Sequence, residues 1–149
     1  MEIPCPRWEQ TGLGSCTVRL VMPGQIRFKH RVAIDVVIAH VDWTIETEAD
    51  FAPWYAEYRD YLGALGRKVD LVLELTNFRV SPRVATAFGE YRARVLREFV
   101  NRSYRVNQGP REKTYMYTSS AIHGAPSNDF ETVELAIAAL LADREQSAP

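Results

Sequence analysis

Apolar side chains recur at strand spacing in two early segments of the chain. Residues 17–22 alternate between apolar and polar positions, which predicts a strand with one buried face. Residues 26–41 are rich in β-branched side chains, and residues 32–41 have the nearly continuous apolar character of a strand buried on both faces. Pro23 and Gly24 supply turn chemistry between the two segments, with glycine taking the positive dihedral. We therefore expect a hairpin or two neighbouring strands.

Three later segments repeat apolar residues at the spacing of an amphipathic helix. The first is residues 50–66, with Asp50 as the candidate N-cap. The second opens with Ser81, which is followed by a proline at the first helical position. The third follows a polar loop and is capped by Ser127 or Asn128. The apolar stripes of the three helices are Phe51, Tyr55, Tyr58, Leu62 and Leu65; Val84, Phe88, Tyr91, Val95 and Phe99; and Phe130, Val133, Ile137 and Leu140.

Further strands are expected between these helices. Residues 69–75 place apolar side chains at every second position, and residues 113–119 carry two tyrosines that face the same way. Residues 103–106 fit either a short strand or the end of the preceding helix. Strands that alternate with helices are typical of a sheet with parallel neighbours. The sequence therefore predicts an α/β fold with a mixed sheet of four to five strands and helices packed against it.

Composition limits the class of protein. The chain has 149 residues, of which 46% are hydrophobic, and a formal net charge of -1, which suits one globular domain rather than a disordered chain. We expect an N-terminal arm over residues 1–16, an α/β domain over residues 17–143 and a frayed tail over residues 144–149. The longest apolar run, residues 36–39, is too short to span a membrane. No secretory signal is recognisable, so we expect a cytoplasmic protein, and the excess of arginine over lysine is typical of a GC-rich bacterial genome.

Metal and cofactor chemistry has no support in the sequence. Cys5 and Cys16 have no ligand-type neighbours, so neither a disulfide framework nor a zinc site is expected. The chain has no glycine loop between a strand and a helix that would cradle a phosphate. We expect no metal and no cofactor. The three histidines are scattered along the sequence: His30, His40 and His123.

Nucleic-acid binding is also disfavoured. A nucleic-acid-binding domain usually has a basic overall charge and a recognisable module, and this chain has neither. The basic side chains that would have to follow phosphates are Arg92, Arg94, Arg97, Arg102 and Arg105.

One stretch of the chain resembles a known family. An apolar strand ends in Glu74-Leu75-Thr76, and after a short loop Ser81 caps the next helix. This arrangement resembles the STAS domains of the anti-sigma-factor antagonist family, including its SpoIIAA-like branch. In that family the strand typically ends in Asp-Leu-Ser, and a serine or threonine near the start of the next helix can be phosphorylated by a partner kinase. The resemblance covers about residues 17–141 and implies a single STAS-like domain that acts as a non-catalytic regulatory or protein-interaction module.

Two residues in this stretch are candidate functional groups. Glu74 lies near the carboxyl end of its strand, where ligands bind in open parallel sheets, although its carboxylate would also suit the N–H groups of the loop at Thr76. Ser81 is either a helix cap or a modifiable hydroxyl. A phosphate on Ser81 would lie at the positive end of a helix beside Arg79 and Arg83. These five residues form the expected switch and binding site.

The helix over residues 50–66 offers a candidate interface. Trp54 and Tyr61 fall off its apolar stripe and share one side, and large aromatic residues are enriched at interfaces. The other interpretation is a wide buried face.

We expect a non-catalytic module whose partner is another protein or a second copy of the chain. The alternative is a small-molecule-binding domain or an enzyme with its site around Glu74, where Arg79, Tyr115 or His123 would converge. A structural role in a larger assembly is a third interpretation.

Overall fold

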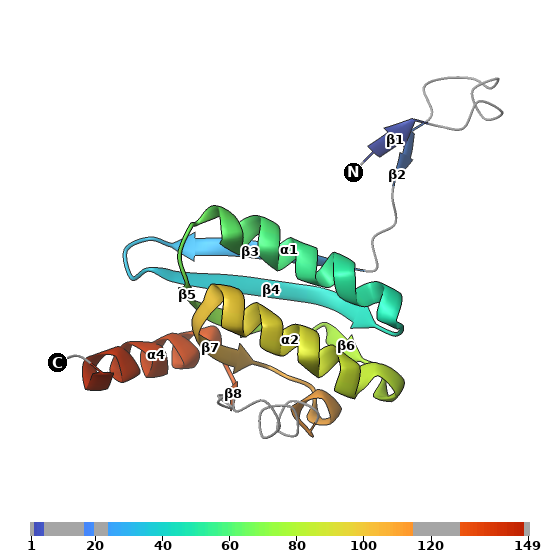
Figure 1. Ribbon diagram of the computed structural model, residues 1–149. Helices are drawn as coiled ribbons and strands as arrows, with labels where there is room; N and C mark the ends of the chain where they lie inside the picture. The colour runs from blue at the N-terminus through green and yellow to red at the C-terminus, as the bar shows by residue number, and fades with distance from the viewer. Residues whose placement is uncertain (1, 5–16, 20–23, 115–128, 148–149) are drawn as a thin grey trace.

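One mixed sheet dominates the computed structural model (Figure 1), which describes residues 2–4, 17–19, 24–114 and 129–147. Its strands follow the order β3-β4-β5-β7-β8, and β6 pairs with β4 beside this path. The β3–β4 pair is antiparallel and every other pairing in this sheet is parallel. The bounds are β3 Gly24–Arg31, β4 Val36–Ile45, β5 Val69–Glu74, β6 Phe78–Val80, β7 Val100–Val106 and β8 Asp129–Phe130. The predicted α/β fold with a mixed sheet is confirmed; two very short strands, β6 and β8, raise the number of strands to six.

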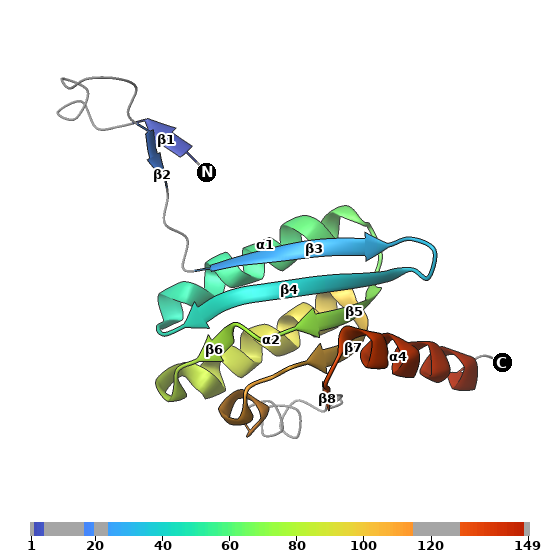
Figure 2. The ribbon, with the colours of Figure 1, turned by 180° about the vertical axis from the view of Figure 1, so that it is seen from behind.

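Helices cover both faces of the sheet. α1 (Phe51–Ala64) and α2 (Ala85–Phe99) pack on one face, and α4 (Val133–Ser147) packs on the other, as Figure 2 shows from behind. Alternate residues of β5 serve the two faces: Leu71 and Leu73 belong to the core under α1 and α2, and Val72 belongs to the core under α4. The strand predicted over residues 69–75 and the two helices predicted from residue 50 and from Ser81 therefore form the framework around the candidate site. None of the helices in the described part of the chain is long and apolar enough to cross a membrane.

The bounds expected for the first two strands were wrong. Residues 26–41 are not one strand, because a turn over residues 32–35 separates β3 from β4. Asp35 closes this turn with a φ of 52°, in the left-handed region that aspartate tolerates better than most residues. The hairpin therefore lies inside the segment that was expected to be a single strand.

Gly24 has a different role from the one expected of it. It begins β3, and it is not among the described glycines with positive φ. A Cβ atom at this position would overlap the backbone oxygen of Asp42 and the side chain of Trp43. Glycine is needed here for close approach and not for a turn. The strand before it, β2 (Thr17–Arg19), pairs with β1 (Glu2–Pro4) in a separate two-stranded sheet.

The segment after α2 also differs from the expectation. β7 begins directly after Phe99, so residues 103–106 belong to a strand. Residues 110–114 are helical, with a hydrogen bond of 2.8 Å from the Lys113 amide to the Gly109 carbonyl. The strand predicted over residues 113–119 is wrong at its first two residues, and its remainder lies outside the described residues.

The last helix begins later and ends later than its pattern indicated. Its cap is Thr132, whose Oγ1 accepts a hydrogen bond of 3.1 Å from the Leu135 amide. The candidate caps Ser127 and Asn128 lie outside the described residues. α4 continues through Ser147, so the boundary expected after residue 143 lies inside it.

Candidate functional site

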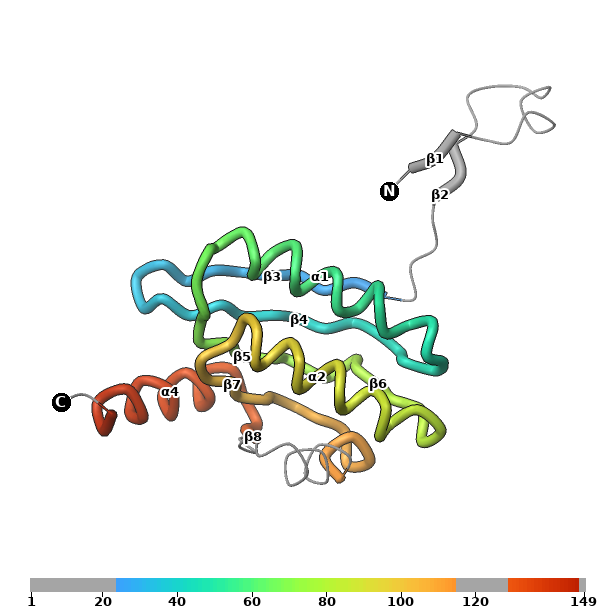
Figure 3. The backbone as a smooth tube through the Cα atoms, viewed as in Figure 1, coloured from blue at the N-terminus to red at the C-terminus, as the bar shows by residue number. Residues whose placement is uncertain are grey.

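Four of the five candidate residues of the expected switch and binding site lie on the segment that connects β5 to α2, residues 75–84, which we call the β5–α2 loop (Figure 3). The fifth, Glu74, is the last residue of β5. Within it, β6 pairs in parallel with the carboxyl end of β4, in the register Trp43 to Phe78 and Ile45 to Val80. The Ser81 amide continues this pairing with a hydrogen bond of 2.8 Å to the Ile45 carbonyl. The loop is therefore held as an extension of the sheet, because its backbone groups are paired with those of β4.

Glu74 uses its carboxylate to hold this loop. Its Oε1 accepts hydrogen bonds from the Thr76 amide at 3.0 Å and from the Thr76 hydroxyl. Burial raises the pKa of Glu74, but hydrogen bonds from Thr76, Asn107 and His40 outweigh burial, so the pKa lies below its ordinary value. The group is ionised at neutral pH and bound to its own loop.

His40 is the partner of Glu74 that the sequence did not indicate. The parallel register of β4 and β5 places His40 opposite Glu74, and His40 Nδ1 lies 3.6 Å from Glu74 Oε2. The two side chains form an ion pair whenever the imidazole is protonated. They are 34 positions apart in the sequence, and only the strand register brings them together.

The two arginines of the loop behave differently. Arg79 folds back on its own backbone, and its Nη1 donates to the carbonyls of Phe78 at 2.7 Å and Thr76 at 3.1 Å. Arg83 is exposed. Only Arg83 therefore presents its guanidinium to solvent without a hydrogen bond to the loop carbonyls.

Ser81 lies where a helix cap was expected, but its hydroxyl does not cap. It is the N-cap residue of a short 3-10 helix, η3 (Pro82–Val84), which leads directly into α2, and its side chain makes no capping hydrogen bond. The turn is closed instead by the Ser81 carbonyl, which accepts a hydrogen bond of 3.1 Å from the Val84 amide. Ser81 is half-buried as a residue, and its hydroxyl is not used as a cap at the start of this helical segment.

A buried carboxylate that the sequence did not indicate also binds the backbone of the loop. Glu112, only 2% exposed, accepts a hydrogen bond of 3.3 Å from the Val80 amide and lies 3.5 Å from Arg111 Nε. Gly109 makes room for it, because a Cβ there would collide with the Glu112 carboxylate. No local pattern identifies such a residue, since its partner is 32 positions away.

The predicted interface on α1 was wrong for Trp54. Trp54 is 4% exposed and packs edge-on against Tyr58 and Phe88, because α2 lies against this side of α1. Tyr61 is half-buried and stacks on Phe28 of β3 at a centroid distance of 4.3 Å. The wide buried face is the correct interpretation for Trp54.

The arginines between residues 92 and 105 do not form one surface. Arg92 and Arg105 are buried, Arg102 lies 3.6 Å from Asp70, and Arg94 pairs with Glu98 at 2.6 Å. Within the described ranges, no group of histidine, cysteine and acidic side chains could hold a metal ion. Four residues that the sequence singled out lie outside those ranges: Cys5, Cys16, Tyr115 and His123.

The comparisons with known proteins concern the fold. No protein-family model matches the chain, and no curated protein matches it in sequence. Among solved structures, it is similar to an anti-sigma factor antagonist from Mycobacterium paratuberculosis, with a TM-score of 0.57 and 12% identity over 82% of this chain and 97% of that chain. The chain has a STAS-like fold. A second similar structure is an uncharacterised DUF3478-family protein with a SpoIIAA-like fold from Shewanella loihica, with a TM-score of 0.55 and 10% identity over 80% of this chain and 95% of that chain.

Proposed function

We propose that this STAS-like chain is a non-catalytic regulatory module that binds a protein partner through the β5–α2 loop. The observation that carries the proposal is Ser81, a half-buried residue at the start of the helical segment leading into α2, whose hydroxyl makes no capping hydrogen bond. One solved structure of similar fold is that of an anti-sigma factor antagonist. A regulatory role for this chain extends that likeness from fold to function.

The loop suits recognition because it is rigid and polar on its outside. Its backbone is held by three sets of contacts: β6 pairs with β4, the Val80 amide donates to Glu112, and the Thr76 amide donates to Glu74. A preorganised loop loses little conformational entropy on binding. Its exposed residues are Thr76, Asn77, Arg79, Pro82 and Arg83.

The Ser81 hydroxyl also suits a switch by phosphorylation. A phosphate there would add about two negative charges in front of a helical segment and close in sequence to the exposed Arg83. The added charge would change both the shape and the electrostatics of the loop that the partner contacts. A partner that binds the unmodified loop would therefore be released.

The test compares four versions of the chain as baits in the native host's lysate, followed by binding measurements with the purified partner. These are wild type, Ser81→Ala, Ser81→Asp and Thr86→Asp. Thr86 is exposed in the first turn of α2, so Thr86→Asp adds the same charge to the same region away from the loop. We expect wild type, Ser81→Ala and Thr86→Asp to bind alike, and Ser81→Asp to bind at least about tenfold more weakly.

Two results would count against the proposal. If no protein binds wild type specifically, the chain is not an interaction module of this kind. If Ser81→Asp and Thr86→Asp weaken binding equally, the effect is one of general charge and Ser81 has no special position. Mass spectrometry of the chain from its native host provides the direct check for phosphate on Ser81.

A further inference from the structure

β3 forms one long edge of the main sheet. Within the described residues its sheet partner is β4 alone, and the core under α4 takes no side chain from it. Figure 2 shows β3 along the margin of the sheet, with α4 over the strands at the far side. An edge strand directs the N–H and C=O groups of every second residue away from its neighbour. β3 has eight residues and no proline, so these groups form an uninterrupted template for a further strand.

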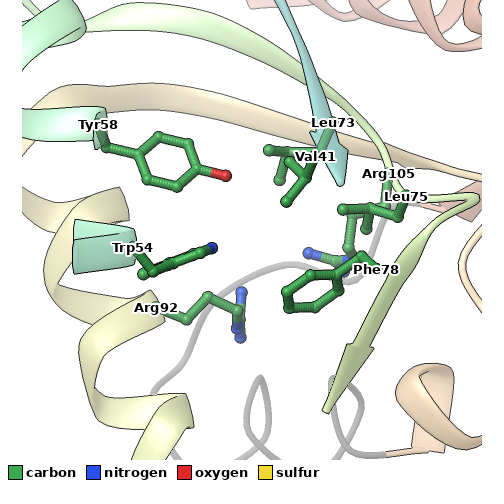
Figure 4. Close-up of a pocket in the computed structure, with 8 residues that line it drawn as sticks. All are labelled: Val41, Trp54, Tyr58, Leu73, Leu75, Phe78, Arg92 and Arg105. Carbon is green, nitrogen blue, oxygen red and sulfur yellow. The ribbon is translucent and has the colours of Figure 1, made fainter. Parts of the chain in front are cut away.

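The side of β3 that faces α1 is aromatic and apolar. Ile26 belongs to the core of this layer. Phe28 stacks on Tyr61 at a centroid distance of 4.3 Å and meets Tyr58 edge-on at 5.7 Å. Figure 4 shows Tyr58 turned inward, where it lines a small cavity together with Val41. Phe28 and Tyr61 are both half-buried, so a strand added to β3 would meet an apolar surface on this side.

The opposite side of β3 carries three exposed cations at alternate positions. They are Arg27, Lys29 and Arg31, and successive ones are about 7 Å apart because a strand rises about 3.4 Å per residue. The β4 residues opposite them, none of them acidic, are His40, Ile38 and Val36. None of the three cations forms an ion pair with another described residue. Carboxylates that pair with this row would therefore have to come from a strand on the free side of β3.

The same charges disfavour self-association through this edge. In an antiparallel pair of two β3 strands the cations of both copies would lie on one face, next to each other. Like charges in that position destabilise a pair of strands, and basic residues on edge strands prevent edge-to-edge association in this way. An acidic strand reverses the effect, because each repulsion becomes an attraction.

We propose that β3 binds an extended acidic segment of another protein, which adds to the sheet as a further strand. Acidic side chains at every second position of that segment pair with Arg27, Lys29 and Arg31. The residues between them are apolar and pack beside Phe28 and Tyr61. In strand addition, backbone hydrogen bonds supply the affinity and alternate side chains supply the specificity. This surface contains no residue of the β5–α2 loop, so it is independent of the switch proposed there.

The probe is a capped peptide of the length of β3, eight residues, in which valine alternates with glutamate. One control peptide has lysine in place of every glutamate. The other has proline at both central positions, which prevents pairing as a strand. NMR spectra of the ¹⁵N-labelled protein report binding at each amide. We expect the glutamate peptide to shift the signals of β3 and slow the hydrogen exchange of its amides, and both control peptides to bind at least about tenfold more weakly.

A charge reversal on β3 tests whether its cations select the peptide. Lys29→Glu should weaken binding of the glutamate peptide about tenfold and narrow its advantage over the lysine peptide. Arg97→Glu makes the same change of charge at an exposed position of α2 and should bind as wild type does. Lys29 is exposed, so the variant should keep its fold, which circular dichroism checks. Equal losses of binding in the two variants would overturn the proposal.

Four further results would also overturn it. If the glutamate peptide leaves the β3 signals unchanged, the edge does not accept a strand. If the lysine peptide binds equally well, charge does not select the partner. If the proline peptide binds equally well, the row attracts any polyanion, such as a nucleic acid or an anionic membrane surface. If the outward amides of β3 are protected without peptide, the edge is already covered, by a second copy where light scattering finds a dimer and by the chain itself where it finds a monomer.

Discussion

Asp35 joins three segments of the chain at a single position in the β3–β4 turn. Its Oδ1 accepts hydrogen bonds from Arg67 Nη2 at 2.6 Å and from His30 Nε2 at 2.9 Å. Its backbone carbonyl accepts a hydrogen bond of 2.8 Å from Arg144 on α4. The hydrogen bonds from Arg67 and His30 lower the pKa of Asp35 from 3.8 to about 2. The carboxylate is therefore more stable in its ionised form in the folded chain than in the unfolded chain.

A depressed pKa predicts how stability depends on pH at this residue. The ionised Asp35 contributes stability above the unfolded pKa of 3.8, and the contribution is lost as pH falls through about 2. Asp35→Asn keeps a residue that tolerates positive φ and removes the charge. We expect the variant to be less stable at pH 5 by under about 1 kcal/mol, since the pair is exposed. Urea unfolding should show this difference shrinking between pH 5 and pH 2.

Asp60→Asn is the control, because Asp60 is an exposed acid that pairs only with the adjacent Arg59 in the described structure. It should leave stability close to that of wild type across the same range. A difference between Asp35→Asn and wild type that stays constant from pH 5 to pH 2 would contradict the proposed role of the Asp35 carboxylate.

Single residues at the candidate site show how far sequence reasoning reaches. Glu74, Thr76 and Ser81 could be placed at the end of a strand and the start of a helix, because these are local features. His40 and Glu112 could not be found, since each meets its partner through pairings between segments more than 30 positions apart. Trp54 was misplaced for a related reason: the apolar period of α1 does not indicate that α2 covers an additional side of it.

At the scale of elements, α4 is attached to the sheet by a polar contact as well as by its apolar stripe. Arg144 Nε donates to Asp70 Oδ2 at 2.8 Å, and its Nη1 donates to the Ile34 carbonyl at 2.5 Å. Asp70 is 6% exposed and also receives a hydrogen bond of 3.3 Å from Asn101. The carboxyl end of α4 is thus fixed to β5 and to the turn before β4.

Replacement of Arg144 should loosen this end of the helix. Arg144→Met removes the hydrogen bonds and keeps much of the apolar stem, and it leaves the buried Asp70 carboxylate with fewer partners. We expect a loss of about 2 kcal/mol in the free energy of unfolding and faster amide hydrogen exchange in the last two turns of α4. Gln146→Met, at an exposed position nearby, makes the same substitution without the contact. Equal exchange in the two variants would contradict the anchoring role.

Length and repetition decide which elements could be predicted. α1, α2 and β5 repeat their apolar pattern over enough positions to be recognised, and all three are confirmed. β6 and β8 have three and two residues, too few for a period, and they exist because β4 and β7 present free edges beside them. The hairpin in residues 24–45 was missed because the turn at residues 32–35 begins with three apolar residues, Val32, Ala33 and Ile34, which continue the apolar pattern of β4.

At the scale of the whole molecule, two cores share a single sheet. The larger core lies under α1 and α2 and contains Trp43 and Trp54, and the smaller core lies under α4 and contains Leu140. Because β4 and β5 contribute alternate residues to both, neither core can be lost without uncovering one face of the strands that carry the other. This coupling predicts one cooperative unfolding transition for the two layers.

Leu140→Ala tests the coupling from the side opposite to the tryptophans. Leu140 is fully buried against the sheet, so the substitution should cost about 2–4 kcal/mol. In a Trp8→Phe background, fluorescence reports only on Trp43 and Trp54, while far-ultraviolet circular dichroism reports on all helices. We expect both signals to shift together to lower urea concentration, and Leu135→Ala, which is 52% exposed on the same helix, to shift neither appreciably. Coupling through the shared sheet means that the loss of one layer destabilises the other. If circular dichroism loses helix signal at urea concentrations where the fluorescence is still native, α4 and its core unfold as a separate unit, and the predicted coupling is wrong.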